Sequence, residues 1–103
     1  MLTAQEALIQ LQEGNQRFVE GKSTYNTNDK RRRNELVDGQ TPFAIILGCS
    51  DSRVPTEIVF DQGLGDLFVI RIAGNIVAPS QIGSIEFAVE TFQTPLVVVL
   101  GHT

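Results

Sequence analysis

The residues best suited to chemistry follow an apolar run near the middle of the chain. Cys49, the only cysteine among the 103 residues, comes directly after Gly48 and the run 43–47, and Asp51 and Arg53 follow it closely. The only histidine, His102, occupies the equivalent place after a second apolar run at 96–100. A thiolate and an imidazole are ligands that suit zinc. The spacing therefore predicts a metal site with Cys49 and His102 as two of its ligands.

Asp51 and Arg53 leave two arrangements of that site open. Asp51 could be a third ligand in a closed state, or it could pair with Arg53 and leave a coordination position for water. In the open arrangement zinc would lower the pKa of water to about 7, giving hydroxide for attack on a small electrophile. Taken alone, each residue also has a simpler interpretation. The cysteine could be an inert buried residue, the histidine a structural one, and Asp51 with Arg53 an ordinary salt bridge.

Three short apolar runs predict the strands that would position these residues. They span 43–47, 67–72 and 96–100, and they are rich in Val, Ile, Leu and Phe. Their nearly continuous hydrophobicity predicts strands covered on both faces, as in a parallel sheet. Ligands of such sheets collect beyond the carboxyl ends of the strands. If the first and third strands are neighbours, Cys49 and His102 meet there.

Helices are predicted before and between these strands. The first is an amphipathic helix from Thr3 to about Glu20, with a Thr3–Glu6 capping box and a stop at Gly21, and a weaker helix follows from about Asp29 to Val37. A short crossover helix is predicted at 55–61, with Pro55 in its first turn and Gly63 after its end. A second crossover helix, capped by Ser80 or Ser84, has an apolar face formed by Ile82, Ile85, Ala88, Val89 and Phe92. This order predicts an α/β fold with a parallel sheet core and right-handed crossover helices. We expect one domain over 1–103, with 1–38 as an N-terminal helical arm.

Composition excludes several functional classes. Hydrophobic residues make up 42% and charged residues 19%, and no apolar run approaches the ~20 residues of a membrane span. The net charge of -4 gives no general attraction to nucleic acid, and the basic cluster 30–33 is expected to be a solvated helix face or a contact for an acidic partner. The absence of a signal-peptide pattern and the single cysteine predict a cytoplasmic location.

Four elements of the sequence together resemble the β-class carbonic anhydrases. They are Cys49-Ser50-Asp51-Ser52-Arg53-Val54-Pro55, the segment 66–75 ending in Arg71-Ile72-Ala73-Gly74-Asn75, Gly83-Ser84-Ile85-Glu86-Phe87-Ala88, and Gly101-His102. The Cys-x-Asp-x-Arg element is specific when it is joined to Arg-x-Ala-Gly-Asn and a later histidine at a strand end. The resemblance runs the length of the chain and corresponds to about the first half of such an enzyme.

The resemblance implies an enzyme for the zinc-dependent, reversible hydration of carbon dioxide to bicarbonate and a proton. It implies that Cys49 and His102 are zinc ligands and that Asp51 and Arg53 form a catalytic dyad. The positions that match substrate-contacting residues of the family are Gln40, Phe68, Ala73 and Gly74. Each has a local alternative, as a loop residue for Gln40, a core residue for Phe68 and a tight turn for the other two. The family is dimeric or of higher order, which implies that the N-terminal helix packs on a neighbour and that Gln40 and Phe68 approach the partner's metal.

The family pattern continues His-x-x-Cys, whereas this sequence ends at Thr103 and holds one cysteine. We therefore expect zinc to bind more weakly than in the full pattern, because ligand count and charge set affinity. Two alternatives follow. The chain could be a metal-free, catalytically inactive fragment or a module that associates with itself through an exposed sheet edge. It could also be a hydrolase of a carbon dioxide analogue, such as carbon disulfide, on the same fold.

Overall fold

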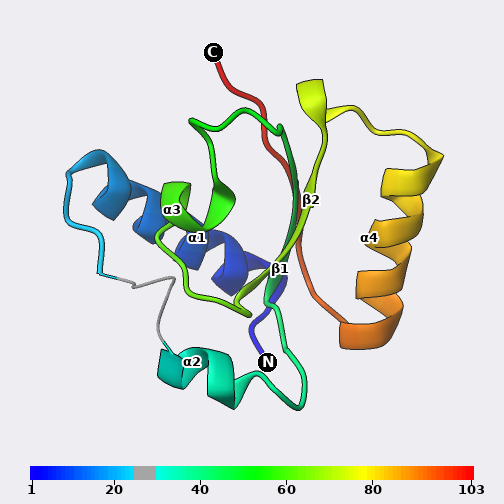
Figure 1. Cartoon of the computed structure of the whole chain (residues 1–103), viewed down its shortest axis with the longest axis horizontal. Coiled ribbons are helices and arrows are strands. Elements are labelled where there is room, and N and C mark those ends of the chain that lie inside the picture. Colours follow the sequence, from blue (N-terminus) through cyan, green and yellow to red (C-terminus); the bar gives the residue numbers. More distant parts are fainter. Residues whose placement is uncertain (25–29) are drawn as a thin grey trace.

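The computed structural model describes residues 1–24 and 30–103 and is built around a three-stranded parallel sheet (Figure 1). Strand β1 (Ala44–Gly48) is central, with β2 (Leu67–Arg71) on one side and β3 (Val97–Val99) on the other. Ile45 pairs with Phe68 of β2 and with Val97 of β3. The predicted parallel sheet is confirmed, and the condition for Cys49 and His102 to meet, that the first and third apolar runs are neighbours, holds in the structure.

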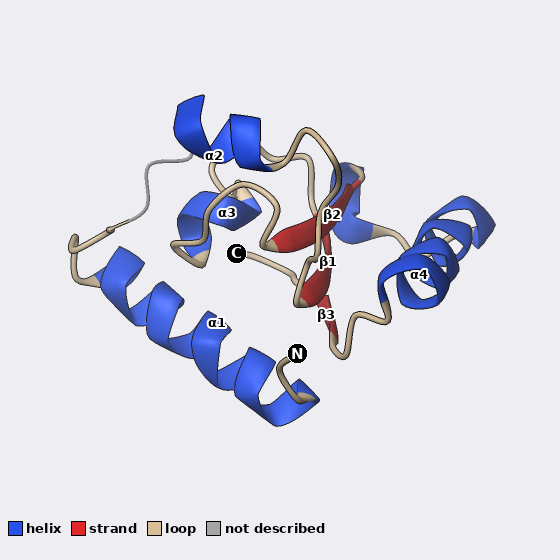
Figure 2. Cartoon of the chain, turned by 90° about the horizontal axis from the view of Figure 1, so that it is seen from below, coloured by secondary structure: helices blue, strands red, loops and turns tan. Residues whose placement is uncertain are grey.

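Four α-helices and a short 3-10 turn complete the part of the chain that the structure describes. They are α1 (Ala4–Val19), α2 (Lys30–Glu35), α3 (Thr56–Val59), the turn η1 (Ala73–Asn75) and α4 (Pro79–Phe92). Figure 2 shows α1 and α3 on one side of the sheet and α4 on the other. We call the first side the closed face and the second the open face. No helix in the described residues is both long and apolar enough to cross a membrane.

The N-terminal helix begins as the sequence predicts. The Thr3 hydroxyl accepts the Glu6 backbone N–H at 3.1 Å, and the Glu6 carboxylate accepts the Thr3 N–H at 2.9 Å. This reciprocal capping box satisfies N–H groups that have no partner inside the helix. The helix ends before Gly21, whose φ of 70° lies in the left-handed region that glycine adopts without strain.

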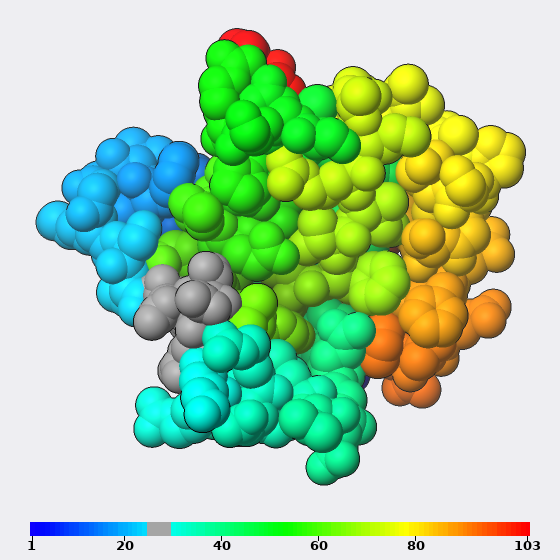
Figure 3. Space-filling model, viewed as in Figure 1, coloured from blue at the N-terminus to red at the C-terminus, as the bar shows by residue number. Residues whose placement is uncertain are grey.

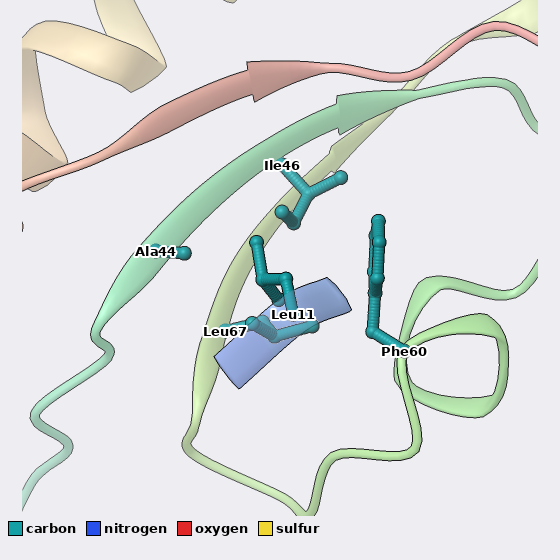
Figure 4. Packing of buried hydrophobic residues seen from close by; sticks show 5 residues of the cluster. All are labelled: Leu11, Ala44, Ile46, Phe60 and Leu67. Atoms are coloured by element: carbon teal, nitrogen blue, oxygen red, sulfur yellow. The ribbon is translucent and has the colours of Figure 1, made fainter. Parts of the chain in front are cut away.

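The closed face is sealed by close packing of α1 against the sheet and against the end of α3. Its core consists of Leu11, Ala44, Ile46, Phe60 and Leu67 (Figure 4). Gly14 of α1 lies so close to the chain after α3 that a Cβ atom there would be 1.8 Å from the Phe60 carbonyl oxygen. Glycine is therefore required at this helix contact by space, not by backbone conformation.

A buried carboxylate ties the two helices of the closed face together. Asp61 is 2% exposed, and its carboxylate accepts hydrogen bonds from the Arg17 guanidinium. It also accepts the Thr24 backbone N–H at 3.1 Å and the Thr24 hydroxyl at 3.0 Å. A buried charge needs such partners, because leaving it unpaired away from water is costly.

The open face is covered only in part. Phe68 of β2 meets Phe87 and Phe92 of α4 with ring centroids 6.0 and 5.9 Å apart. Several apolar side chains of α4 and β3 nevertheless remain 41% to 55% exposed, namely Ile82, Phe87, Val89, Val97 and Val99. Because β1 is the central strand while β2 and β3 form the two edges of the sheet, only β1 is buried along its whole length. The prediction that all three strands are covered on both faces holds for β1, holds only in part for β2, and is wrong for β3.

The start of α4 differs from the prediction. Ser80 and Ser84 lie inside the helix, which begins at Pro79. The Ala78 N–H instead donates to the Gln81 side-chain oxygen at 3.2 Å. Proline suits a first helical position because its φ is already helical and it has no N–H to satisfy. The proline therefore sets the start of this helix, and neither serine caps it.

Two other helices are shorter than predicted. Helix α3 ends at Val59, because Asp61 adopts a left-handed φ of 49° well before Gly63. Helix α2 ends at Glu35 and not at Val37. The predicted start of α2 at Asp29 lies outside the described residues.

Candidate metal and catalytic site

The loop after β1 holds the Cys49 thiol between two backbone N–H donors. Cys49 is buried, and its Sγ accepts the N–H of Asp51 at 3.4 Å and that of Gly74 at 3.3 Å. Gly74 has a φ of 75°, in the left-handed region where other residues are strained. Glycine at position 74 therefore allows the backbone of η1 to point the Gly74 N–H at the Cys49 sulfur.

The same loop is held from β2 by Arg71, the last residue of that strand. Its Nε donates to the Cys49 carbonyl at 2.7 Å, and a terminal nitrogen donates to the Asp51 carbonyl at 2.6 Å. No site role was predicted for this arginine from the sequence. The available signal was its place in the Arg-x-Ala-Gly-Asn element at a predicted strand end.

Asp51 is paired with Arg53 in the open arrangement. The guanidinium donates to the two carboxylate oxygens at 3.0 and 2.7 Å, and the Arg53 backbone N–H adds a bond of 2.8 Å. These bonds hold the pKa of Asp51 well below its usual range and raise the pKa of Arg53. Asp51 is therefore a carboxylate at neutral pH.

His102 reaches Cys49 from the end of β3. In Figure 3 the C-terminal residues, in red, lie against the green loop that follows β1. The N–H of Asp51, then the His102 side chain and the N–H of Gly74, lower the pKa of Cys49 to about 7. Hydrogen bonding to Cys49, and then to the Thr103 carbonyl, raises the pKa of His102. The two residues meet as the strand order requires, and their roles as metal ligands stay predictions.

The donor set fits part of a zinc site. A thiol whose pKa is lowered to about 7 beside an imidazole offers two ligands of the kind that zinc prefers. Within residues 1–24 and 30–103, however, no three His, Cys, Asp or Glu side chains are grouped to hold a metal ion. Asp51 faces Arg53, so it does not complete the set as the closed state would require.

The other predicted site residues divide between two ends of the sheet. Ala73 and Gly74 lie in η1, and Gly74 contacts the Cys49 sulfur. Gln40 precedes β1 while Cys49 follows it, so the two lie at opposite ends of that strand. Phe68, near the start of β2, packs against the aromatic rings of α4. Within one chain the structure does not bring Gln40 or Phe68 to the cysteine.

From the start of β1 to its last residue, the chain matches a known protein family. Residues 44–103 match the family model described as carbonic anhydrase. Carbonic anhydrase 2 of Mycobacterium tuberculosis is 52% identical over 92 residues, and a carbonic anhydrase of Mycolicibacterium smegmatis is 50% identical over 92 residues. Each match covers 89% of this chain. The chain spans 44% and 45% of the length of these relatives, respectively.

Solved structures show the same fold. The β-carbonic anhydrase CcaA aligns with a TM-score of 0.68 at 34% identity, over 93% of this chain and 44% of that one. A β-carbonic anhydrase of the ascomycete Sordaria macrospora, described as tetrameric, aligns with a TM-score of 0.67 at 30% identity. That match covers 89% of this chain and 47% of the Sordaria chain.

Proposed function

The chain belongs to the β-carbonic anhydrase family, and from this premise we propose that its strand ends provide part of a site for the reversible hydration of carbon dioxide. The observation that supports this best is the convergence of Cys49 and His102 beside an Asp51–Arg53 ion pair. Cys49 and His102 would hold zinc. The chemistry that zinc supplies when bound is the activation of water at neutral pH.

The residues around the thiol have separate tasks in this proposal. Arg53 keeps Asp51 ionised and turned away from the metal position. The Asp51 carboxylate can then accept a hydrogen bond from the attacking water and orient it toward carbon dioxide. The N–H groups of Asp51 and Gly74 stabilise the Cys49 thiolate as a ligand.

Two ligands are fewer than the three protein ligands typical of a catalytic zinc site. The chain covers 44% of the length of the Mycobacterium tuberculosis relative, so the remaining ligand is proposed to lie in a part of the family pattern that these 103 residues do not include. The site residues of this chain therefore bind zinc weakly by themselves.

A homo-oligomer is part of the same proposal. Gln40 and Phe68 lie away from the Cys49 of their own chain, so they could serve the site of a second copy. The Sordaria relative is described as a tetramer, which supports this arrangement. The proposed location is the cytoplasm, supported by a free cysteine that a reducing compartment keeps as a thiol.

Zinc binding and carbon dioxide hydration test the proposal together. We expect the 103-residue chain to bind zinc in competition with a chromophoric chelator, and Cys49→Ser to abolish that binding. Asp51→Asn should retain zinc and lose hydration activity. Lys22→Met, which removes an exposed charge elsewhere, should change neither.

Three outcomes would count against the proposal. Absence of both zinc binding and a hydration rate above buffer would identify the chain as an inactive fragment. Hydrolysis of carbon disulfide without hydration of carbon dioxide would establish the analogue as substrate. Zinc binding that survives Cys49→Ser would place the metal elsewhere.

A further inference from the structure

The loop that presents Cys49 and Asp51 begins where the backbone hydrogen bonds between β1 and the segment that continues β2 end. The Ile72 N–H donates to the Gly48 carbonyl at 3.0 Å, and β1 ends there. From that point the described contacts between the β2 segment and the loop are made by the Arg71 side chain and by the Gly74 N–H. A side chain thus continues the attachment where the strand ladder stops.

The guanidinium of Arg71 suits this task because its geometry is planar and fixed. It spans two carbonyls of residues two positions apart, Cys49 at 2.7 Å and Asp51 at 2.6 Å. The Asp51 carbonyl also accepts the Val54 N–H at 3.1 Å, so this point of the loop is held from two sides. An ammonium has the same charge but presents a single nitrogen, which cannot reproduce the fork.

Arg71 and Gly74 belong to one short segment, and their effects are coupled. Arg71 fixes the backbone on both sides of Ser50, which sets the direction of the Cys49 side chain and of the Asp51 N–H. Gly74, three residues after Arg71, donates to the same sulfur. A displacement of the loop away from Arg71 would therefore lengthen the Gly74 contact to the thiol, and a change of the loop backbone around Ser50 would alter the Asp51 contact.

We propose that Arg71 is a positioning residue for the Cys49–Asp51 loop. Its guanidinium bonds to the two carbonyls hold the thiolate and the carboxylate in the orientation that a metal ligand and its neighbouring acceptor need. Arg71 touches neither metal nor substrate in this role. The inference depends on the proposed zinc function for its consequence, but the loop geometry can be tested without metal.

The first measurement uses the metal-free chain. We expect Arg71→Lys to speed amide hydrogen exchange at Asp51 and Gly74 about tenfold, while the amide of Ile46 in β1 exchanges as in the unchanged chain. Arg71→Met, which keeps much of the stem and removes the charge, should have the same effect. Lys22→Met removes a positive charge at a distance and should leave all three amides unchanged.

The second measurement uses zinc and cobalt. Loss of a partner that orients a ligand typically weakens metal binding about 10-fold to 100-fold, and we expect Arg71→Lys to lie near the lower value. The thiolate-to-cobalt charge-transfer band should shift in Arg71→Lys and stay unchanged in Lys22→Met. If no variant and not even the unchanged chain binds metal, the proposed function fails while the exchange rates still decide the role of Arg71.

Two results would overturn the role of Arg71. One is wild-type exchange at Asp51 and Gly74 in Arg71→Lys, which would show that charge alone or other contacts hold the loop. The other is loss of the whole sheet in both Arg71 variants, seen by circular dichroism. In that case Arg71 supports the fold in general and does not position the loop.

Discussion

The two faces of the sheet use similar side chains but differ in how completely those side chains are removed from water. On the closed face Phe60 is 8% exposed, and helix α1 contacts the chain after α3 without space for a methyl group at Gly14. On the open face Phe87 is 53% exposed, and a Cβ atom added at Gly83 of α4 would meet nothing within 4 Å beyond the neighbouring residues and backbone of its own helix. Stability is therefore expected to depend on the closed face, while the open face tolerates change.

Truncating one phenylalanine on each face should give the largest contrast. Phe60→Ala removes a buried ring and leaves a cavity, which typically costs about 3 to 5 kcal/mol. Phe87→Ala loses contacts to Phe68 and Phe92 from a ring that is already half in water, and should cost about 1 kcal/mol. Urea unfolding followed by circular dichroism measures both. Equal losses would show that the open face is sealed in solution.

A pair of glycines offers the next test. Gly14→Ala places a methyl group against the Phe60 carbonyl, so α1 must move, at a cost of about 3 kcal/mol. Gly83→Ala meets nothing and improves helix propensity, which should stabilise the chain by about 0.5 to 1 kcal/mol. Thermal melting of both variants decides the matter, since the comparison requires opposite signs.

The buried carboxylate of the closed face should matter less than its packing. Asp61→Asn removes the charge that Arg17 and Thr24 surround, and we expect a loss of about 2 kcal/mol, below the values for a fully buried pair because Arg17 is partly exposed. Glu90→Gln on the exposed side of α4 should change stability by less than about 0.5 kcal/mol. Chemical denaturation at neutral pH compares them. A neutral effect of Asp61→Asn would show that the amide replaces the carboxylate in this network.

The smallest expected effect is a difference between the starts of α1 and α4 in how their contribution to stability depends on pH. Bonds from Thr3 lower the pKa of Glu6 in the folded chain, so the ionised carboxylate contributes stability above its unfolded pKa and loses that contribution as pH falls through the folded value. Glu6→Gln should therefore destabilise the chain at pH 7 and make little difference at strongly acidic pH. At α4 the corresponding residue is the neutral Gln81, so Gln81→Ala should cost the same at both pH values. Denaturation midpoints at the two pH values test this, and a pH-independent effect of Glu6→Gln would refute it.

Much of the fold could be predicted because local patterns and global packing agree. The capping box at Thr3 and Glu6 and the three apolar runs each specify one structure, whereas the strand order is known only from the structure. The partial exposure of β2 and β3 could not be predicted from these local patterns. An apolar run does not show whether its strand will be central or at an edge, and the strand order together with the position of α4 decides which side chains remain exposed.

The site could be predicted in its residue types and less well in its contacts. Cys49, Asp51, Arg53 and His102 are conspicuous because of their chemistry and their places at strand ends. The task of Arg71 was not predictable from spacing, because its bonds go to backbone carbonyls that carry no sequence signal. Likewise the buried pairing of Arg17 with Asp61 joins residues whose separation in sequence has no helical or strand period.

The strand order, together with the order along the chain, allows β1 and β2 to pair first during synthesis. Ile45 finds its partner Phe68 after one short crossover, whereas about half the chain separates Ile45 from Val97. A nascent chain can thus pair β1 with β2, and attach the Cys49 loop to Arg71 and Gly74, before β3 has left the ribosome. Until then the second edge of β1 is unpaired, which exposes the strand that is most completely buried in the folded chain to other nascent chains. The thiol is held in place early, and His102 reaches it last.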